Sequence, residues 1–242
     1  MGRIGASTSH SAGSGPVRSA SSPGWVGDWD GEQSAPRLSE ALRAFAATYD
    51  RRMSGPIVLP QPPLTDDLVT LRAWREDDLP EVVHCFDDDE IARWLPPIPQ
   101  PYNDADAREW FATLRPRLAS GDGAAFAIVE AETGALLGGI GLRSEGDRRV
   151  EVGYWVRRER RGEGIAPSAL RLISGWAIEQ LGVARLQLHA DVENVASQRV
   201  AERAGYTREG VLRSWLEHRG ERRDHVLYSL LATEWRTQTF GS

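Results

Sequence analysis

Between residues 68 and 231 the hydrophobic positions of the chain follow two different periods. Segments with an apolar residue at every second position predict half-buried strands, and segments with apolar residues three or four positions apart predict helices. Leu170, Ile173 and Ala177, for example, recur at helical spacing. The predicted strands are 68–74, 124–130, 136–143, 150–156, 185–190, 206–213 and 225–231. The predicted helices run from residue 75 to about 86, from Asn103 or Asp104 past Leu114, from 167 to 181, and from a cap at Asn194 to Gly205.

The order of these elements predicts the fold class. It is one strand, two helices, three strands, a helix, a strand, a helix and two strands. The three central strands are joined by short turns and are therefore expected to be antiparallel. The pattern predicts a mixed α/β (α+β) fold with no internal repeat.

The first 60 residues do not follow this pattern. Up to about Pro36 they are dominated by Gly, Ser, Ala and Pro, a composition that buries too little apolar surface to form a core. We therefore expect a disordered tail over 1–60, with a short helix at 39–52 and a proline-rich linker at 54–63. The folded domain is expected over 66–236.

Composition and charge exclude several classes of protein. The sequence has no lysine, so its 29 basic residues are all arginine, and 35 acidic residues leave a net charge of −6. Lysine Schiff-base chemistry and the P-loop lysine are excluded, and an arginine-rich nucleic-acid binder would need a broader basic face. The single Cys85 predicts no disulfide, and the histidine spacing predicts no metal site. With no signal peptide and no 18-residue apolar run, we expect a cytoplasmic protein without a membrane span.

The segment between the strand at 150–156 and the helix that begins near Pro167 contains the clearest chemical signal. Gly162 and Gly164 let backbone N–H groups converge, and the following helix adds partial positive charge at its N-terminus. This arrangement predicts a pyrophosphate cradle. Four arginines offer further charge to phosphates: Arg157, Arg158, Arg160 and Arg161. The alternative is a glycine turn beside a solvated arginine run.

Two motifs resemble those of a known family. Arg161-x-x-Gly164-x-Ala166, with residues 151–155 before it, resembles the acyl-coenzyme A motif of the GNAT superfamily of N-acetyltransferases. Asn194-x-x-Ser197, with the Gly-aromatic pair at 205–206, resembles the RimJ/RimL branch, the ribosomal-protein alanine N-acetyltransferases. The resemblance covers about residues 68–235.

This resemblance implies a splayed, mostly antiparallel sheet, with acetyl-CoA bound where the strand of Tyr154 parts from the strand of Leu188. It implies direct transfer of the acetyl group to a primary amine without a covalent enzyme intermediate. The implied coenzyme contacts are Trp155, Val156, Arg161, Gly162, Gly164, Ala166, Asn194 and Ser197. The implied acceptor contacts are Trp94 and Tyr102 in a proline-rich loop.

Alternation along the strand at 150–156 places Glu151 on the face opposite the valines, beside the expected cleft. Glu151 is our candidate general base, and the alternative is a solvated strand residue. A backbone N–H of Trp155 or Val156 is expected to stabilise the oxyanion. The resemblance makes Ser197 the group that meets the coenzyme sulfur and acts as general acid, with Tyr228 as a weaker alternative. Asn194 is either a helix cap alone or a cap that also contacts the coenzyme.

One segment departs from the branch. Where the ribosomal-protein enzymes can carry a further acidic residue, this chain has Leu216, and Glu217 would face the opposite side of the strand. His189 is interpreted as structural or as lining the cleft. The acceptor is left open between a protein N-terminus and a small-molecule amine, and a homodimer is also left open. A non-catalytic acyl-CoA-binding or regulatory module is the alternative function.

Overall fold

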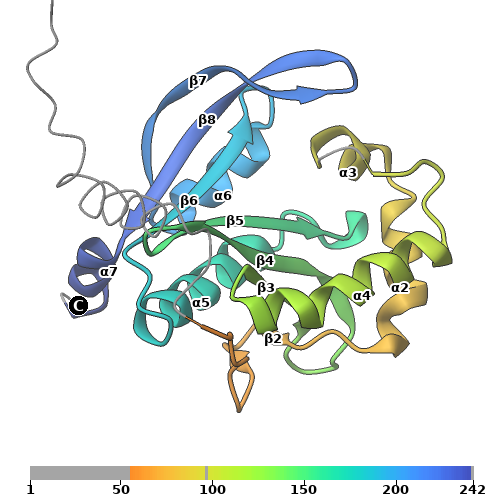
Figure 1. Ribbon diagram of the computed structural model, residues 1–242, viewed down its shortest axis with the longest axis horizontal. Helices are drawn as coiled ribbons and strands as arrows, with labels where there is room; N and C mark the ends of the chain where they lie inside the picture. Colours follow the sequence, from red (N-terminus) through yellow and green to blue (C-terminus); the bar gives the residue numbers. More distant parts are fainter. Residues whose placement is uncertain (1–54, 96–97, 241–242) are drawn as a thin grey trace, which may run out of the picture. The chain divides into compact units, whose positions relative to one another are not determined.

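The computed structural model describes residues 55–95 and 98–240, and their centre is one eight-stranded sheet. The strands lie in the order β1-β2-β3-β4-β5-β6-β8-β7 (Figure 1). Their bounds are β1 Leu64–Thr65, β2 Val69–Arg72, β3 Gly123–Glu130, β4 Leu136–Gly146, β5 Arg149–Val156, β6 Arg185–Asp191, β7 Thr207–His218 and β8 Glu221–Leu231. All neighbouring strands are antiparallel except β5 and β6. The expected mostly antiparallel mixed sheet is confirmed.

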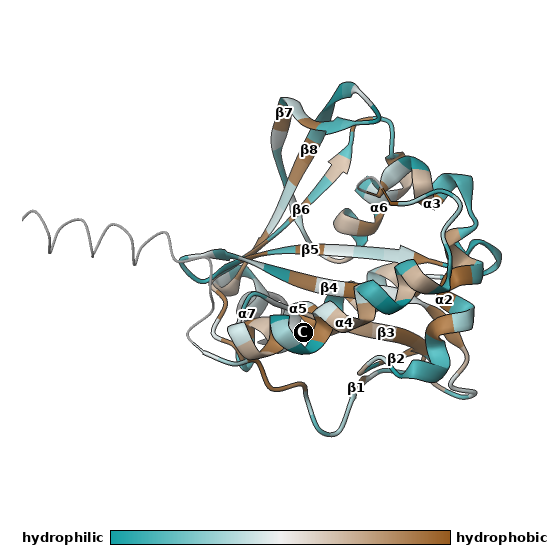
Figure 2. Ribbon diagram, turned by 45° about the vertical axis from the view of Figure 1, so that its right-hand side comes forward, coloured by the Kyte–Doolittle hydropathy of each residue, from teal (hydrophilic) through white to brown (hydrophobic). Residues whose placement is uncertain are grey.

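The sheet opens between β5 and β6. These two strands pair over only three positions, from Arg149 opposite Arg185 to Glu151 opposite Gln187. Beyond them Tyr154 and Leu188 have no partner across the gap, and Leu188 pairs instead with Tyr228 of β8. Figure 2 shows β6, β7 and β8 rising away from β5. The expected splay is therefore confirmed.

Helices cover both faces of the sheet. Their bounds are α2 Leu79–Phe86, after a 3-10 turn at Glu76–Asp78, then α3 Asp89–Trp94, α4 Asp104–Ser120, α5 Ile165–Glu179, α6 Val195–Arg203 and α7 Ala232–Phe240. The N-terminus of α4 is fixed by Asn103, whose side-chain oxygen accepts the Ala105 N–H at 2.8 Å. Gly121, with φ 76°, ends the same helix in the left-handed conformation.

The core has two parts because side chains of β3 alternate between the two faces of the sheet. Phe126 and Ile128 pack with α5 in the larger hydrophobic cluster. Ala127 and Val129 pack with residues of α2 and α3 in the smaller one, which also contains Cys85. Cys85 is buried in this cluster, and burial raises the pKa of its thiol to about 11.

Some boundaries differ from the prediction. The helices α3 and α7 were not predicted, because each is short and has too few apolar residues at helical spacing to be distinguished from a loop. The expected tail to residue 60 is too long, because Ile57 is buried and its N–H donates to Leu118 O at 2.8 Å. The expected helix at 39–52 and the rest of the tail lie outside the described residues.

Candidate active site

Two cavities meet at the opening between β5 and β6. The loop cavity, about 420 Å³, is lined by the segment after β5 and by α5 and α6. The sheet cavity, about 610 Å³, is lined by residues of α4, β3, β4, β5, β6 and β7. Six residues line both of them: Trp94, Leu95, Tyr154, Trp155, Asn194 and Ser197. A molecule in one cavity can therefore meet a molecule in the other at these side chains.

The loop cavity ends at the N-terminus of α5. Gly162 and Gly164 have φ of 86° and 84°, a left-handed conformation that disfavours residues with a Cβ. A Cβ at Gly162 would have no neighbour within 4 Å, and one at Gly164 would meet only the Leu68 side chain at 3.8 Å. Both glycines thus border open space beside first-turn N–H groups that have no side-chain cap. This geometry fits the pyrophosphate of a coenzyme.

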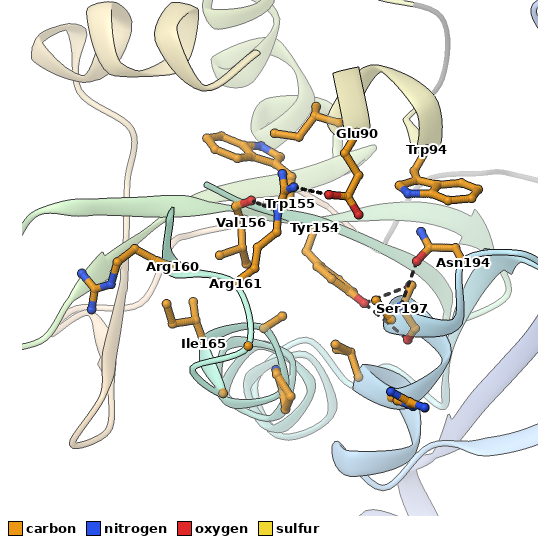
Figure 3. A pocket seen from close by; sticks show the side chains of 18 of the residues that line it. Glu90, Trp94, Tyr154, Trp155, Val156, Arg160, Arg161, Ile165, Asn194 and Ser197 are labelled. Atoms are coloured by element: carbon orange, nitrogen blue, oxygen red, sulfur yellow. Dashed lines mark hydrogen bonds and ion pairs between the residues drawn. The ribbon is translucent and has the colours of Figure 1, made fainter. Parts of the chain in front are cut away.

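Three arginines of this loop form ion pairs with nearby carboxylates. Arg161 donates to Asp88 at 2.5 Å and to Glu90 at 2.6 Å, and its Nε donates to Val156 O at 3.0 Å (Figure 3). Arg160 pairs with carboxylates at Glu130 and Glu163, and Arg157 pairs with Glu81 and Glu159. The Arg161 guanidinium thus ties the loop to α3, and its expected contact with the coenzyme stays a prediction.

At the junction of the two cavities lies a pair of hydroxyl groups. The Tyr154 hydroxyl and Ser197 Oγ are 2.9 Å apart, and the Ser197 N–H donates to Asn194 Oδ1 at 3.0 Å (Figure 3). Burial raises the pKa of the Tyr154 phenol to about 12, so this group keeps its proton near neutral pH. Sequence reasoning identified Ser197 and Asn194 but did not give Tyr154 a role. Tyr154 could have been singled out from the sequence, because it belongs to the 151–155 segment of the acyl-coenzyme A motif and shares the inward face of the strand with the valines.

Backbone N–H groups near the end of β5 face the opening between β5 and β6. Arg157 N donates to Leu137 O at 2.9 Å, so in a regular strand the N–H of Trp155, two residues earlier, faces β4 as well. The backbone N–H and C=O of Val156 point away from β4, and accordingly the Val156 carbonyl accepts a hydrogen bond from Arg161 Nε. Of the two predicted oxyanion donors, the register therefore favours Val156. The Trp155 indole still lines both cavities.

Glu151 lines the sheet cavity, as alternation predicted, and is ion-paired with Arg143, which also binds Glu145. His189 lies on the neighbouring strand in the same cavity. Both of its ring nitrogens are buried without a hydrogen-bond partner in the described part of the chain. Burial lowers the pKa of this imidazole, whereas the charge of Glu151 acts to raise it. Extending the parallel register places His189 level with Gly153, closer to the cavity junction than Glu151 is.

Three other expectations have clear outcomes in the structure. Tyr102, expected at the acceptor, instead stacks on Phe86 with ring centroids 4.8 Å apart and lines neither cavity. Tyr228 is buried and donates to Glu202 at 2.9 Å, which removes it as an alternative acid. Leu216 lines the sheet cavity and Glu217 does not, as strand alternation predicted.

Residues 55–95 and 98–240 are the part of the chain that the structure describes. These residues contain no group of three or more His, Cys, Asp or Glu side chains that could hold a metal ion. No helix within the same ranges is long and apolar enough to cross a membrane.

Comparison with known proteins identifies the family. The acetyltransferase (GNAT) domain model matches residues 69–207. The chain is 39% identical over 104 residues to "Putative ribosomal N-acetyltransferase YdaF" of Bacillus subtilis (strain 168), a match that covers 42% of this chain and 57% of that relative. It is 26% identical over 172 residues to "Uncharacterized N-acetyltransferase YoaA" of the same organism, covering 70% and 97% of the two chains.

Among solved structures, RimJ of Mycobacterium smegmatis in complex with CoA-disulfide aligns with a TM-score of 0.64 at 25% identity, covering 72% of this chain and 89% of that one. The match to the GNAT model includes the loop at Gly162 and Gly164 and the cap at Asn194, and it agrees with the cavity geometry. The chain therefore belongs to the GNAT family of acetyltransferases, close to its RimJ/RimL branch, and is an acyltransferase that uses acetyl-CoA as co-substrate.

Proposed function

We propose that this enzyme transfers the acetyl group of acetyl-CoA directly to a primary amine, either of a protein N-terminus or of a small molecule. The observation that carries the proposal is the meeting of the loop cavity and the sheet cavity at Tyr154 and Ser197. A coenzyme in the first cavity and an amine in the second would bring thioester and nucleophile together. Direct transfer needs no nucleophilic side chain, only groups that hold charge and move protons.

The residues of the loop cavity suit acetyl-CoA. The N–H groups around Gly162 and Gly164, with the N-terminus of α5, would hold the pyrophosphate, and Ala166 and Asn194 border the same space. When bound, the coenzyme supplies an activated acetyl group. We assign Asn194 both proposed roles, because it caps α6 through the Ser197 N–H and also lines both cavities.

Attack on the thioester carbonyl places negative charge on its oxygen. The Val156 N–H is directed into the opening between β5 and β6, where we propose that it donates to this oxygen. Loss of one such donor typically costs about 3 kcal/mol of transition-state stabilisation. Arg161 supports this segment, since it holds the Val156 carbonyl.

The attacking amine must lose a proton, and we propose Glu151 as its acceptor. Glu151 lies three residues before Tyr154 on β5, about 10 Å along the strand. The proton therefore has to cross by way of water or of His189, which lines the space between them. Arg143 neutralises the Glu151 carboxylate only in part, because it is shared with Glu145.

The departing thiolate needs a proton in return. Ser197 is in the first turn of α6 at the cavity junction, and its Oγ is hydrogen-bonded to the Tyr154 hydroxyl. We propose that Ser197 donates to the sulfur and that Tyr154 resupplies the proton. The raised pKa of Tyr154 keeps the phenol protonated for this purpose.

A thiol-release assay tests the proposal. Purified protein is incubated with acetyl-CoA and a panel of N-terminal peptides and small primary amines, and free coenzyme A thiol is measured. Amine-dependent thiol release, with an N-acetyl product seen by mass spectrometry, is the expected result. Tight acetyl-CoA binding by calorimetry without turnover of any amine would instead support a non-catalytic acyl-CoA-binding module.

A further inference from the structure

We infer that the sheet cavity selects a primary amine that carries a flat aromatic group and discriminates against polyamines and other polycations. This inference rests on the proposed function and adds the chemical class of the acceptor. The aromatic amine can be a free arylalkylamine or the N-terminus of a peptide that begins with an aromatic residue. Four features of the cavity carry the inference.

The first feature is an aromatic wall. The Trp74 ring is stacked on Trp155, with centroids 6.3 Å apart and an interplanar angle of 20°, and it meets Trp110 edge-on at 5.2 Å. Trp94 and Trp215 also line the cavity, so five indoles from different segments surround it. Aromatic faces of this kind bind planar apolar groups through large contact area and offset stacking.

The second feature is a floor without side chains. Gly139 and Gly141 of β4 and Gly153 of β5 line the cavity. A Cβ at Gly153 would meet nothing within 4 Å, so its absence leaves open space. A Cβ at Gly139 would lie 2.7 Å from the Trp155 indole nitrogen and 2.9 Å from the Trp74 ring. Glycine at 139 therefore allows the two indoles to lie against the strand, and glycine at 153 leaves a flat surface beside them.

The third feature is a local distortion of the hairpin that positions Trp215. The register between β7 and β8 shifts between Leu212 and Leu216, and Ser214 has φ 53°. The distortion is held in place because Ser214 N donates to Asp224 Oδ1 at 2.6 Å. It lays the Trp215 ring against His189, with centroids 5.0 Å apart. Trp215 and Leu216 thus add apolar surface to the cavity.

The fourth feature is the balance of charge. Two carboxylates line the sheet cavity, Glu151 and Asp191, and each is already ion-paired, with Arg143 and with Arg223 respectively. Arg117 adds a further positive charge to the lining. Each of these carboxylates already has an arginine partner, so a polycation would lose hydration and would have to compete with an existing ion pair.

The test compares kcat/KM with acetyl-CoA for 2-phenylethylamine, tryptamine, spermidine, and two peptides that differ only in an N-terminal Phe or Ala. We expect the aromatic amines to exceed spermidine by about tenfold or more, the range that apolar pockets achieve. The paired peptides show whether the aromatic group is accepted as part of a peptide. Higher kcat/KM for spermidine or the Ala peptide would overturn the aromatic class and leave the proposed function standing.

Two variants connect the preference to the cavity. Gly153→Val puts a side chain on the floor, and Trp215→Leu removes one indole. Each should lower kcat/KM for 2-phenylethylamine by about tenfold, with a clearly smaller loss for propylamine, and should leave the KM for acetyl-CoA little changed. Val211→Ala is the matched control, since Val211 is an exposed apolar residue on the same strand that does not line the cavity. Equal losses for both amines would contradict an aromatic site.

If no amine is acetylated, the proposed function fails and binding decides the inference separately. Calorimetric titration of 2-phenylethylamine into the protein saturated with coenzyme A should still show binding that Trp215→Leu weakens. Absence of binding there would overturn the aromatic class as well.

Discussion

The hydrogen-bonded hydroxyls of Tyr154 and Ser197 lie where the two cavities join, and they are the residues that most directly test the mechanism. Ser197→Ala should lower kcat with little change in the KM of the acceptor, because an interaction formed in the transition state is lost. Tyr154→Phe should have a smaller effect of the same kind, since Ser197 remains in place. Steady-state kinetics of both variants, with circular dichroism to confirm folding, provides the check. Unchanged kcat in Ser197→Ala would move the acid to another group.

Glu151 is tested against a neighbour that shares its arginine. Glu151→Gln should reduce turnover by about 10²- to 10⁴-fold and distort the rise of rate with pH, as expected when a general base is lost. Glu145→Gln is the matched control, because Glu145 binds the same Arg143 but lines neither cavity. Coenzyme binding by calorimetry should survive both changes. Full activity in Glu151→Gln would assign the base to His189 or to a water chain.

His189 gives the protein a predictable dependence of stability on pH. Its pKa is lowered from 6.5 by burial, so as pH falls the unfolded chain takes up a proton before the folded protein does. Stability is therefore expected to be higher above pH 6.5 and to decrease as pH falls below it. His189→Gln should make the melting temperature less dependent on pH between 7 and 5. A melting curve series with unchanged pH dependence would contradict this role.

At the scale of elements, we propose that the start of α5 binds the coenzyme. Gly164→Val should abolish acetyl-CoA binding, since φ 84° disfavours a branched residue and the new side chain would fill the space beside the helix N-terminus. Gly182→Val is the matched control. Gly182 follows the other end of α5 with φ 66°, borders open space and lines neither cavity.

Both glycine variants should lose a similar amount of stability, because each strains the same kind of backbone conformation. Only Gly164→Val should lose affinity in a calorimetric titration with acetyl-CoA. Equal affinities would remove the loop from the binding site.

At the scale of the whole molecule, the described core begins at Ile57 and the family match begins at residue 69. A chain that starts at Met53 is therefore expected to melt close to the temperature of the full chain and to bind acetyl-CoA equally well. A chain that starts at Leu64 should be less stable by about 1.5–3 kcal/mol, because the burial of the Ile57 side chain is lost. Thermal melts and coenzyme titrations of both truncated chains test this. A large loss in the longer chain would show that the first 52 residues stabilise the domain.

Much of the architecture followed from the sequence because strand and helix periods are local properties of the chain. The alternation in 150–156 placed Glu151 and Trp155 on one face and the valines on the other, and the structure agrees. The cap at Asn194 and the glycines at 162 and 164 were also found, since caps and left-handed turns restrict residue type within a few positions. The packing of Tyr102 on Phe86 did not follow from the sequence, because an aromatic residue in a loop packs equally well in a core or in a cavity.

The sequence by itself determined the order of the main strands and helices, the glycine loop before α5 and the family, since each depends on residues close together in the chain. Only the tertiary structure decided which distant groups meet. It paired Arg161 with Asp88 and Glu90, 73 and 71 positions away, and it brought Tyr154 to Ser197 across 43 positions. It also gathered five indoles around one cavity. Such contacts depend on how strands separate and helices pack, and no local period of the sequence specifies them.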